Sequence, residues 1–406
     1  MTRDVSTPLD MTKDEELRRR EFPICANKIY LAHAADAPLP RRVADAMHDF
    51  IENAACNEKL FDESLAFIAQ TRELIAGFIG AQPDEVSLTG PTSSGLSAIA
   101  NGLDWNAGDE VVCYLDEYPA NVYPWLALQR RAVKIVFLEP ACIGEITPEM
   151  VERALTKRTK LVALASANYC SGYRINIDAI GSLCHERGAF FSVDGIQTLG
   201  AFSIPLGHVD FLSAGAQKWM LGPSGAGILF VSNRVRDLLW PSVIGGWNVR
   251  APNFIAQSEI EFAAGGQKFE PGGYNYVPLA GMAAAVALLT EIGLDEISAR
   301  ILRLTRLLRE QIAPAGFEFL SPAEDEHRCG ILTFRDPQVE TEALMNVLIA
   351  NNIVASLRRD RSDRAWLRIS PHFYNTTAEI ERVAELLRSS EAPQLSPTCL
   401  RAIGPR

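Results

Sequence analysis

The feature that most constrains the fold is a series of short apolar segments that alternate with helical ones. Seven segments are apolar runs rich in β-branched or aromatic residues: residues 85–90, 109–115, 133–138, 160–166, 189–195, 209–216 and 226–232. Such runs are typical of strands that are buried on both faces of a sheet. Helical segments lie between most of them, and the one at residues 176–188 ends at Gly188 as a helix C-cap does. The alternation predicts an α/β fold with a mostly parallel seven-stranded sheet and helices on both faces.

The pattern changes near residue 285. A long amphipathic helix is expected at residues 293–312, followed by shorter apolar segments at 329–335, 345–357, 365–370 and 377–389. These segments predict a smaller α+β domain. We therefore expect a large domain at residues 31–285, a small domain at 286–390, an N-terminal segment at 1–30 that packs with the small domain, and a loose Pro-rich tail at 391–406.

The composition of the chain limits the kinds of partner that it is expected to bind. The net charge of −11 and the pI near 5.2 argue against nucleic acid or an anionic membrane as a partner, so a small-molecule substrate is expected. Eight scattered cysteines without a CxxC pair suggest no metal site and no disulfide framework. No segment resembles a signal peptide or offers about 18 uninterrupted apolar residues, which predicts a cytoplasmic protein.

Polar residues that follow the predicted strands are the candidate site residues, since ligands of open α/β sheets bind beyond the carboxyl ends of the strands. Asp194 directly follows an apolar run, and a buried carboxylate there favours a cationic partner such as a pyridinium nitrogen. Lys218, in a Gly-rich turn, could form a Schiff base with an aldehyde. Thr92 and Ser93 begin a helix, where an anion is stabilised. The alternatives are a helix cap or ion pair for Asp194, a surface lysine, and N-capping by the hydroxyls.

The motifs "SVDGIQTLGAF", "VDFLSAGAQKWMLGPSGAGILFV" and "KFEPGGYNY" together resemble the fold type I enzymes that use pyridoxal 5′-phosphate (PLP). Within them, the chain is similar to the class V aminotransferase and cysteine desulfurase superfamily. The resemblance extends from "YLAHAADAPLP" to "LRISPHFYNT", which is nearly the whole chain.

The resemblance implies a role for each matching residue. Lys218 would hold the cofactor covalently and move the proton at the substrate α-carbon, and Asp194 would pair with the pyridinium nitrogen. The remaining residues that would bind the cofactor are Asn168 and Gln197 at the ring oxygen, Thr92 and Ser93 at the phosphate, and Gln217, which stands where many relatives have a histidine.

Three further positions match the family. Tyr118 falls where desulfurases have a histidine stacked on the pyridine ring, so it keeps the stacking face without an imidazole. Gly273 matches a segment that reaches the partner subunit's phosphate, which implies a homodimer with shared active sites. Arg368 matches the arginine that binds the substrate α-carboxylate, to which Asn168 would also contribute.

One segment departs from the desulfurases. Their mobile loop carries a nucleophilic cysteine, whereas here it reads "VASLRRDRSDRAW" and has none. We expect Arg358 to meet an anionic group on the substrate side chain or a second carboxylate. The alternative is a solvated loop balanced by Asp360 and Asp363. His33 is a further candidate for substrate binding, with a structural histidine as its alternative.

These features predict a PLP-dependent enzyme that acts at the α-carbon of an amino acid, like a class V aminotransferase. The alternatives are a β-eliminating C–S lyase and an epimerase similar to isopenicillin N epimerase. A non-catalytic binding protein with this fold would be expected to lose Lys218 or Asp194, and both are present. The sequence leaves open the substrate side chain, the amino acceptor and which of the three reactions takes place.

Overall fold

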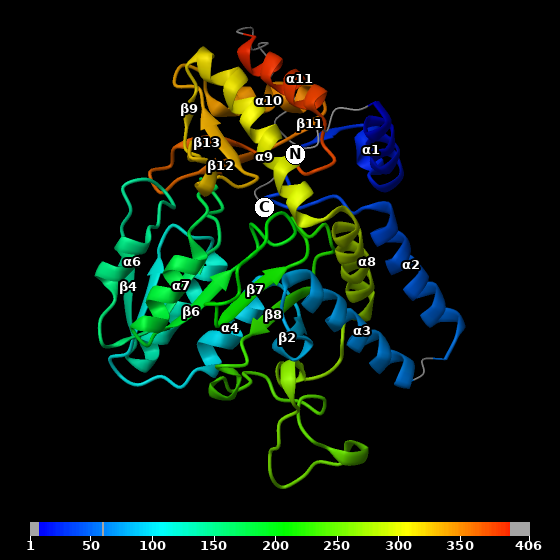
Figure 1. Cartoon of the computed structure of the whole chain (residues 1–406), viewed down its shortest axis with the longest axis vertical. Helices are drawn as coiled ribbons and strands as arrows, with labels where there is room; N and C mark the ends of the chain where they lie inside the picture. Colours follow the sequence, from blue (N-terminus) through cyan, green and yellow to red (C-terminus); the bar gives the residue numbers. More distant parts are fainter. Residues whose placement is uncertain (1–7, 59–60, 390–406) are drawn as a thin grey trace.

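A computed structural model describes residues 8–58 and 61–389. The large domain is built on a seven-stranded sheet of order β2-β8-β7-β6-β5-β3-β4 (Figure 1). Its strands are β2 (Val86–Thr89), β3 (Glu110–Tyr114), β4 (Lys134–Leu138), β5 (Thr159–Ala165), β6 (Phe190–Asp194), β7 (Phe211–Gly215) and β8 (Gly227–Val231). Only β8 runs antiparallel to its neighbours in this sheet, so the predicted mostly parallel sheet is confirmed.

Both faces of the sheet are covered. The helices of the large domain are α2 (Arg41–Cys56), α3 (Phe61–Ile79), α4 (Thr92–Gly102), α5 (Tyr123–Leu126), α6 (Pro148–Ala154), α7 (Ile177–Glu186) and α8 (Tyr276–Ile292). Alternate residues of one strand enter different cores: Val111 packs with Ile99 of α4, whereas Val112 belongs to the cluster of Ile75 and Ile180 on α3 and α7. This double burial is the reason that the strands read as continuous apolar runs.

The small domain contains a four-stranded antiparallel sheet of order β12-β13-β10-β9. Its strands are β9 (Glu318–Phe319), β10 (Leu332–Arg335), β12 (Ser356–Arg359) and β13 (Ala365–Ile369), and its helices are α9 (Leu294–Ile312), α10 (Thr341–Ala350) and α11 (Thr377–Arg388). The boundary expected at residue 285 falls inside α8, which packs against α2 and α3. The break occurs instead at Gly293, whose φ of +89° separates α8 from α9.

The N-terminal segment contacts the small domain. Helix α1 (Pro8–Glu21) carries Arg18, which pairs with Glu379 of α11 at 2.6 Å. Strand β1 (Ile29–Tyr30) pairs in parallel with β11 (Ile353–Val354). The tail expected at residues 391–406 lies outside the described residues.

Among the described residues, no single helix is long and apolar enough to span a membrane. One bent pair of helices, Tyr276–Ile292 and Leu294–Ala315, reaches the required length and apolar content when the two are counted together.

Candidate active site

Asp194 ends strand β6 near the middle of the large sheet. Its side chain is buried, and its Oδ1 accepts the N–H of Ile196 at 3.0 Å. Burial raises the pKa of Asp194 to about 6, although the Ile196 N–H and the charge of Lys218 act in the opposite direction. The carboxylate therefore favours a cationic partner at this point.

Lys218 lies on the connection from β7 to β8, in a tight turn. The N–H of Leu221 donates to the Lys218 carbonyl at 3.0 Å, and Leu221 has a φ of +57°, in the left-handed region that non-glycine residues rarely occupy. Lys218 is 9% exposed. Burial and the charge of Arg368 lower the pKa of Lys218 to about 8, against the raising effect of Asp194. A strained turn thus holds an amine that loses its proton more readily than an exposed lysine does.

Tyr118 lies over this lysine, and Tyr169 packs against Tyr118. The centroid of the Tyr118 ring is 5.4 Å from Lys218 Nζ, so Tyr118 is placed for the stacking role implied by the resemblance. Tyr169 packs edge-on against Tyr118, with ring centroids 5.6 Å apart. Tyr169 was not among the residues predicted from the sequence, although its position directly after Asn168 at the end of β5 is a signal that could have indicated it.

Asn168 and Gln197 are buried, and protein contacts use most of their hydrogen-bonding capacity. Asn168 Oδ1 accepts the N–H groups of Cys170 and Ser171 at 3.0 Å each, and its Nδ2 donates to the Asp116 carbonyl at 3.0 Å. Gln197 Nε2 donates to the Ala34 carbonyl at 3.1 Å. Its Oε1 accepts the indole N–H of the residue after Lys218 at 3.1 Å. Each amide keeps one N–H for a ligand, because an amide nitrogen has two.

The amino end of α4 is the candidate anion site. The residue before the helix, Pro91, provides no side-chain cap. Thr92 Oγ1 accepts the N–H of Gly215 at 2.9 Å, which leaves the hydroxyl hydrogen for a ligand, and Ser93 is exposed. The buried Oε1 of Gln217 has no hydrogen-bond partner among the described residues. First-turn N–H groups without a cap favour an anion.

Two arginines meet on one face of the small sheet. Arg368 on β13 pairs with Ser356, and Arg358 on β12 pairs with Trp366, so the two arginines are diagonal neighbours. Arg368 is 1% exposed and donates through Nη1 to the Tyr169 carbonyl. Its Nε and Nη2, and Nε of Arg358, are buried and have no partner among the described residues. Burial and the charge of Arg358 lower the pKa of Arg368 to about 9.

The other arginines of the loop bond elsewhere. Arg359 pairs with Glu342 and Asp363, Arg361 lies 2.5 Å from Asp116 Oδ1, and the Arg364 guanidinium lies over the Trp366 ring at 5.9 Å. Arg358 pairs with no carboxylate among the described residues. The alternative reading, in which these arginines belong to a solvated loop, therefore fits Arg359, Arg361 and Arg364. It does not fit Arg358.

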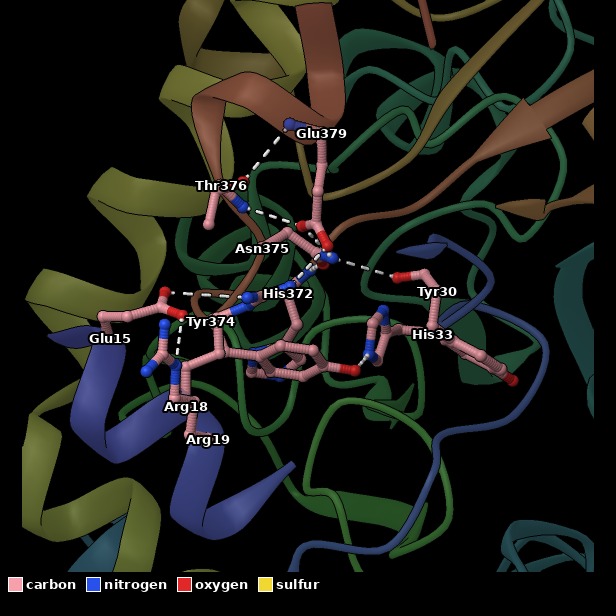
Figure 2. A network of polar contacts seen from close by, with 10 residues as sticks. All are labelled: Glu15, Arg18, Arg19, Tyr30, His33, His372, Tyr374, Asn375, Thr376 and Glu379. Carbon is pink, nitrogen blue, oxygen red and sulfur yellow. Dashed lines mark hydrogen bonds and ion pairs between the residues drawn. The ribbon is translucent and has the colours of Figure 1, made fainter. Parts of the chain in front are cut away.

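His33 is buried, and its side chain lies in a network of polar contacts (Figure 2). His33 Nδ1 donates to the Ser370 carbonyl at 2.8 Å, and Nε2 accepts the Tyr374 hydroxyl at 2.7 Å. Burial lowers the pKa of His33 well below its usual value. Both ring nitrogens are used, so His33 has the structural role that was its alternative, and it offers no group to a substrate. His372 is similar: Nε2 donates to the Trp219 carbonyl at 3.0 Å, directly after Lys218.

Glu117 is a buried carboxylate that the sequence did not single out. It lies between Asp116 and Tyr118 on the loop after β3, and its Oε2 has no partner among the described residues. Burial, followed by the charge of Asp194, raises the pKa of Glu117 to about 8. Like Asp194, Glu117 is a carboxylate near the carboxyl end of a strand of the parallel sheet. This position in the sequence could have indicated it as a candidate site residue.

Gly273 lines a separate cavity of about 310 Å³ together with Ser94, Gly225 and Asn275. Its φ is +64°, and a Cβ there would meet nothing within 4 Å. The segment is fixed by Glu270, whose Oε1 accepts the N–H of Leu88 at 2.6 Å. The structure therefore places Gly273 beside α4, with open space next to it.

Comparisons with known proteins identify the family and the fold of the chain. The sequence matches the family Aminotransferase class-V over residues 29–383. It is 28% identical over 389 residues to a probable cysteine desulfurase of Methanothermobacter thermautotrophicus, a match that covers 91% of this chain and 96% of that one. It is 26% identical over 373 residues to the uncharacterized aminotransferase YcbU of Bacillus subtilis, over 91% of this chain and 96% of that protein.

The fold is also similar to solved structures. The apo cysteine desulfurase of Thermococcus onnurineus NA1 has a TM-score of 0.85 at 23% identity and covers 92% of this chain and 97% of its own. The cystine C–S lyase C-DES, solved with its reaction product cysteine persulfide, has a TM-score of 0.83 at 22% identity and covers 91% and 99%. Since the family match spans most of the sequence, the chain belongs to the class V aminotransferase family, whose enzymes depend on pyridoxal 5′-phosphate.

Proposed function

We propose that this enzyme acts at the α-carbon of a small amino acid that carries a second anionic group, with transamination as the reaction. The observation that carries the proposal is the pair of arginines, Arg358 and Arg368, which lie together without a carboxylate partner among the described residues. Two guanidinium groups so close repel each other, and a bound dianion would remove that repulsion. An amino acid with an acidic side chain has the required two carboxylates.

The residues present fit PLP, a molecule with an aldehyde, a ring nitrogen and a phosphate. Lys218 is a buried amine with a lowered pKa, Asp194 is a buried carboxylate without an ion-pair partner among the described residues, and α4 begins with N–H groups that lack a side-chain cap. Lys218 would hold the aldehyde carbon, Asp194 the ring nitrogen, and Thr92 and Ser93 the phosphate. When bound, the cofactor supplies an electron sink that makes the α-carbon of the substrate acidic.

The side chains then have separate tasks. Arg368 binds the α-carboxylate and is held in place by the Tyr169 carbonyl. The Lys218 amine takes the proton from the α-carbon and returns it, for which a pKa of about 8 is well suited. Asp194 is mostly ionised at neutral pH, because burial raises the pKa of its carboxyl only to about 6. The Tyr118 ring lies over Lys218 Nζ and would stack on the cofactor ring, and Tyr169 packs edge-on against Tyr118.

Arg358 selects the side chain of the substrate. It is partly buried beside Tyr118, Tyr169 and Cys170, and burial lowers its pKa from the usual value for arginine. A charged group held in such surroundings binds an anion more strongly than an exposed arginine does. A neutral side chain would leave Arg358 unpaired, so discrimination against neutral amino acids is expected.

The alternatives are β-elimination, as in a C–S lyase, and epimerisation, because all three reactions begin by removing the α-proton. Persulfide formation by a thiol of this chain has less support. Cys170 and Cys329 are buried, burial raises the pKa of each to about 11, and a thiol in that state is a weak nucleophile. The loop at residues 360–364 has no cysteine.

The proposal is tested by the visible absorbance of the holoenzyme during titration with paired amino acids: L-glutamate with L-glutamine, and L-aspartate with L-asparagine. We expect the acidic member of each pair to bind more tightly and Arg358→Gln to abolish that preference. Arg364→Gln, which removes a loop arginine that lies on Trp366, is the matched control. Equal binding of both members of each pair by the wild type would contradict the proposed substrate class.

The products distinguish the reactions. Release of the 2-oxo acid with the amino group retained by the enzyme indicates transamination, whereas pyruvate with ammonia indicates β-elimination. Inversion at the α-carbon without either product indicates epimerisation. Lys218→Ala should lack all three activities, and a protein that takes up no PLP would contradict the proposal as a whole.

We further propose that the enzyme is a homodimer and acts in the cytoplasm. The segment between β8 and α8 extends from the body of the molecule (Figure 1). It exposes Trp240, Val243, Phe254, Ile255 and Ile260. An apolar projection of this kind is typical of an interface, and a second copy could fill the space beside Gly273. Light scattering should give the mass of a dimer, and Ile255→Asp should lower it.

The cytoplasmic location is supported by the cysteines. Those of the described residues are free, which favours a reducing compartment.

A further inference from the structure

The hairpin between β12 and β13 has a turn that is folded by contacts within the small domain. The Asp360 N–H donates to the Arg364 carbonyl at 3.0 Å. The Asp360 carboxylate accepts the N–H groups of Ser362 and Arg364 and the indole N–H of Trp366, at 2.9 to 3.0 Å. These contacts within the small domain shape the turn.

One side chain of this turn crosses to the large domain. Arg361 Nε lies 2.5 Å from Asp116 Oδ1, and its Nη2 donates to the Leu115 carbonyl at 3.2 Å. Both acceptors lie on the loop that follows β3. Arg359, two residues earlier, bonds instead to Glu342 and Asp363 within the small domain.

Both ends of this contact lead into the active site. On the large domain, the Asp116 carbonyl accepts Nδ2 of Asn168 at 3.0 Å, and Tyr118, two residues further on, lies over Lys218. On the small domain, Arg358 lies on the strand that leads into the turn. The Arg361 contact thus joins the part of the site that holds Tyr118 to the part that holds Arg358.

We propose that the ion pair between Arg361 and Asp116 is a positioning contact, which holds the hairpin against the large domain so that Arg358 is aimed at the distal anionic group of the substrate. The inference rests on the proposed function, because the distal group is the ligand assigned to Arg358. The side chains of the pair are 59% and 30% exposed, so its strength should fall with added salt.

The test uses the full-length holoenzyme and three variants: Arg361→Ala, Asp116→Ala and the double variant. Arg359→Ala is the matched control, since it removes the same charge from the same hairpin without breaking a contact between domains. Hydrogen exchange of residues 360–364 reports whether the hairpin is held. Dissociation constants of L-glutamate and L-glutamine, from absorbance titrations, report whether Arg358 is positioned to bind the distal carboxylate.

We expect each single variant to speed exchange of the hairpin amides and to raise the dissociation constant of L-glutamate about twofold to fivefold at low salt, in the range of partly exposed ion pairs. L-Glutamine binding should be unchanged. The double variant should be no weaker than either single one, and 1 M NaCl should remove the difference from the wild type. The exchanged pair Arg361→Asp with Asp116→Arg should restore binding and protection.

Unchanged hairpin exchange in both single variants would overturn the inference, as would additive losses in the double variant or an equal loss in Arg359→Ala. A wild-type enzyme that does not prefer L-glutamate over L-glutamine contradicts the proposed substrate class. Hydrogen exchange then still decides whether the contact holds the hairpin.

Discussion

Replacing Glu117 by glutamine should make the stability of the cofactor-free protein less sensitive to pH. Burial and the charge of Asp194 raise the pKa of Glu117 from 4.5 to about 8. Between these two values the folded protein holds a proton that the unfolded chain has lost, so the free energy of unfolding falls as the pH rises. Each tenfold change in proton affinity corresponds to about 1.4 kcal/mol. The shift in the pKa of Glu117 can therefore lower the free energy of unfolding at high pH by at most about 5 kcal/mol. Water that reaches the carboxylate in the folded protein reduces this figure, and we expect about 2 to 5 kcal/mol.

The assay is urea unfolding followed by tryptophan fluorescence at pH 5 and pH 9, at one protein concentration. Glu117→Gln cannot ionise, so it should be more stable than the wild type at pH 9 by the amount given above, and the difference should shrink at pH 5. Glu73→Gln, an exposed glutamate on α3, serves as control and should change the free energy of unfolding by less than about 0.5 kcal/mol at either pH. An equal effect of Glu117→Gln at both pH values would refute the reasoning, because it would mean that Glu117 is not protonated in the folded protein at neutral pH.

Three other predictions concern the site. Arg368→Gln should raise the KM of every amino acid substrate by at least about 30-fold, because a buried charge-assisted contact is worth about 2 kcal/mol or more; an unchanged KM would remove Arg368 from the site. His372→Phe should destabilise the protein by about 1 to 3 kcal/mol in urea unfolding, because the buried Trp219 carbonyl and the Phe373 N–H lose their partner. In the cofactor-free protein, the labelling rate of Lys218 by an amine-specific reagent should rise with a midpoint near pH 8, since the neutral amine reacts. A midpoint near 10.5, the ordinary value for lysine, would contradict the proposed electrostatics.

Much of the fold was predictable because its signals are local. Six of the seven strands lie within a segment predicted from its apolar run, and β5 begins one residue before its segment, at Thr159. A strand that is covered on both faces is mostly apolar, which makes it recognisable in the sequence. The small domain was predictable from α9, whose apolar face repeats at helical spacing. The predicted boundary at residue 285 falls inside α8, because α8 is apolar from Val277 to Leu289 and this run gives no sign of where the helix ends.

The candidate site was predictable in part. Lys218, Asp194 and Arg368 were identified from their motifs, and the structure brings them close enough for their charges to act on one another. Glu117 and Tyr169 were missed, although each lies on a loop after a strand of the parallel sheet. That position is a signal in the sequence, but only the folded structure shows which side chains of these loops are buried.

The sheet and the family could be recognised from the sequence alone, because they depend on the order of apolar segments and on short motifs. The contacts between residues that are distant in the chain are known only from the folded structure. The structure shows that His33 is held by Ser370 and Tyr374, that Arg358 lies diagonally from Arg368 on the small sheet, and that Arg361 reaches Asp116. A charged side chain acts through whatever lies within a few ångströms of it, and that surrounding is assembled by folding from segments hundreds of residues apart.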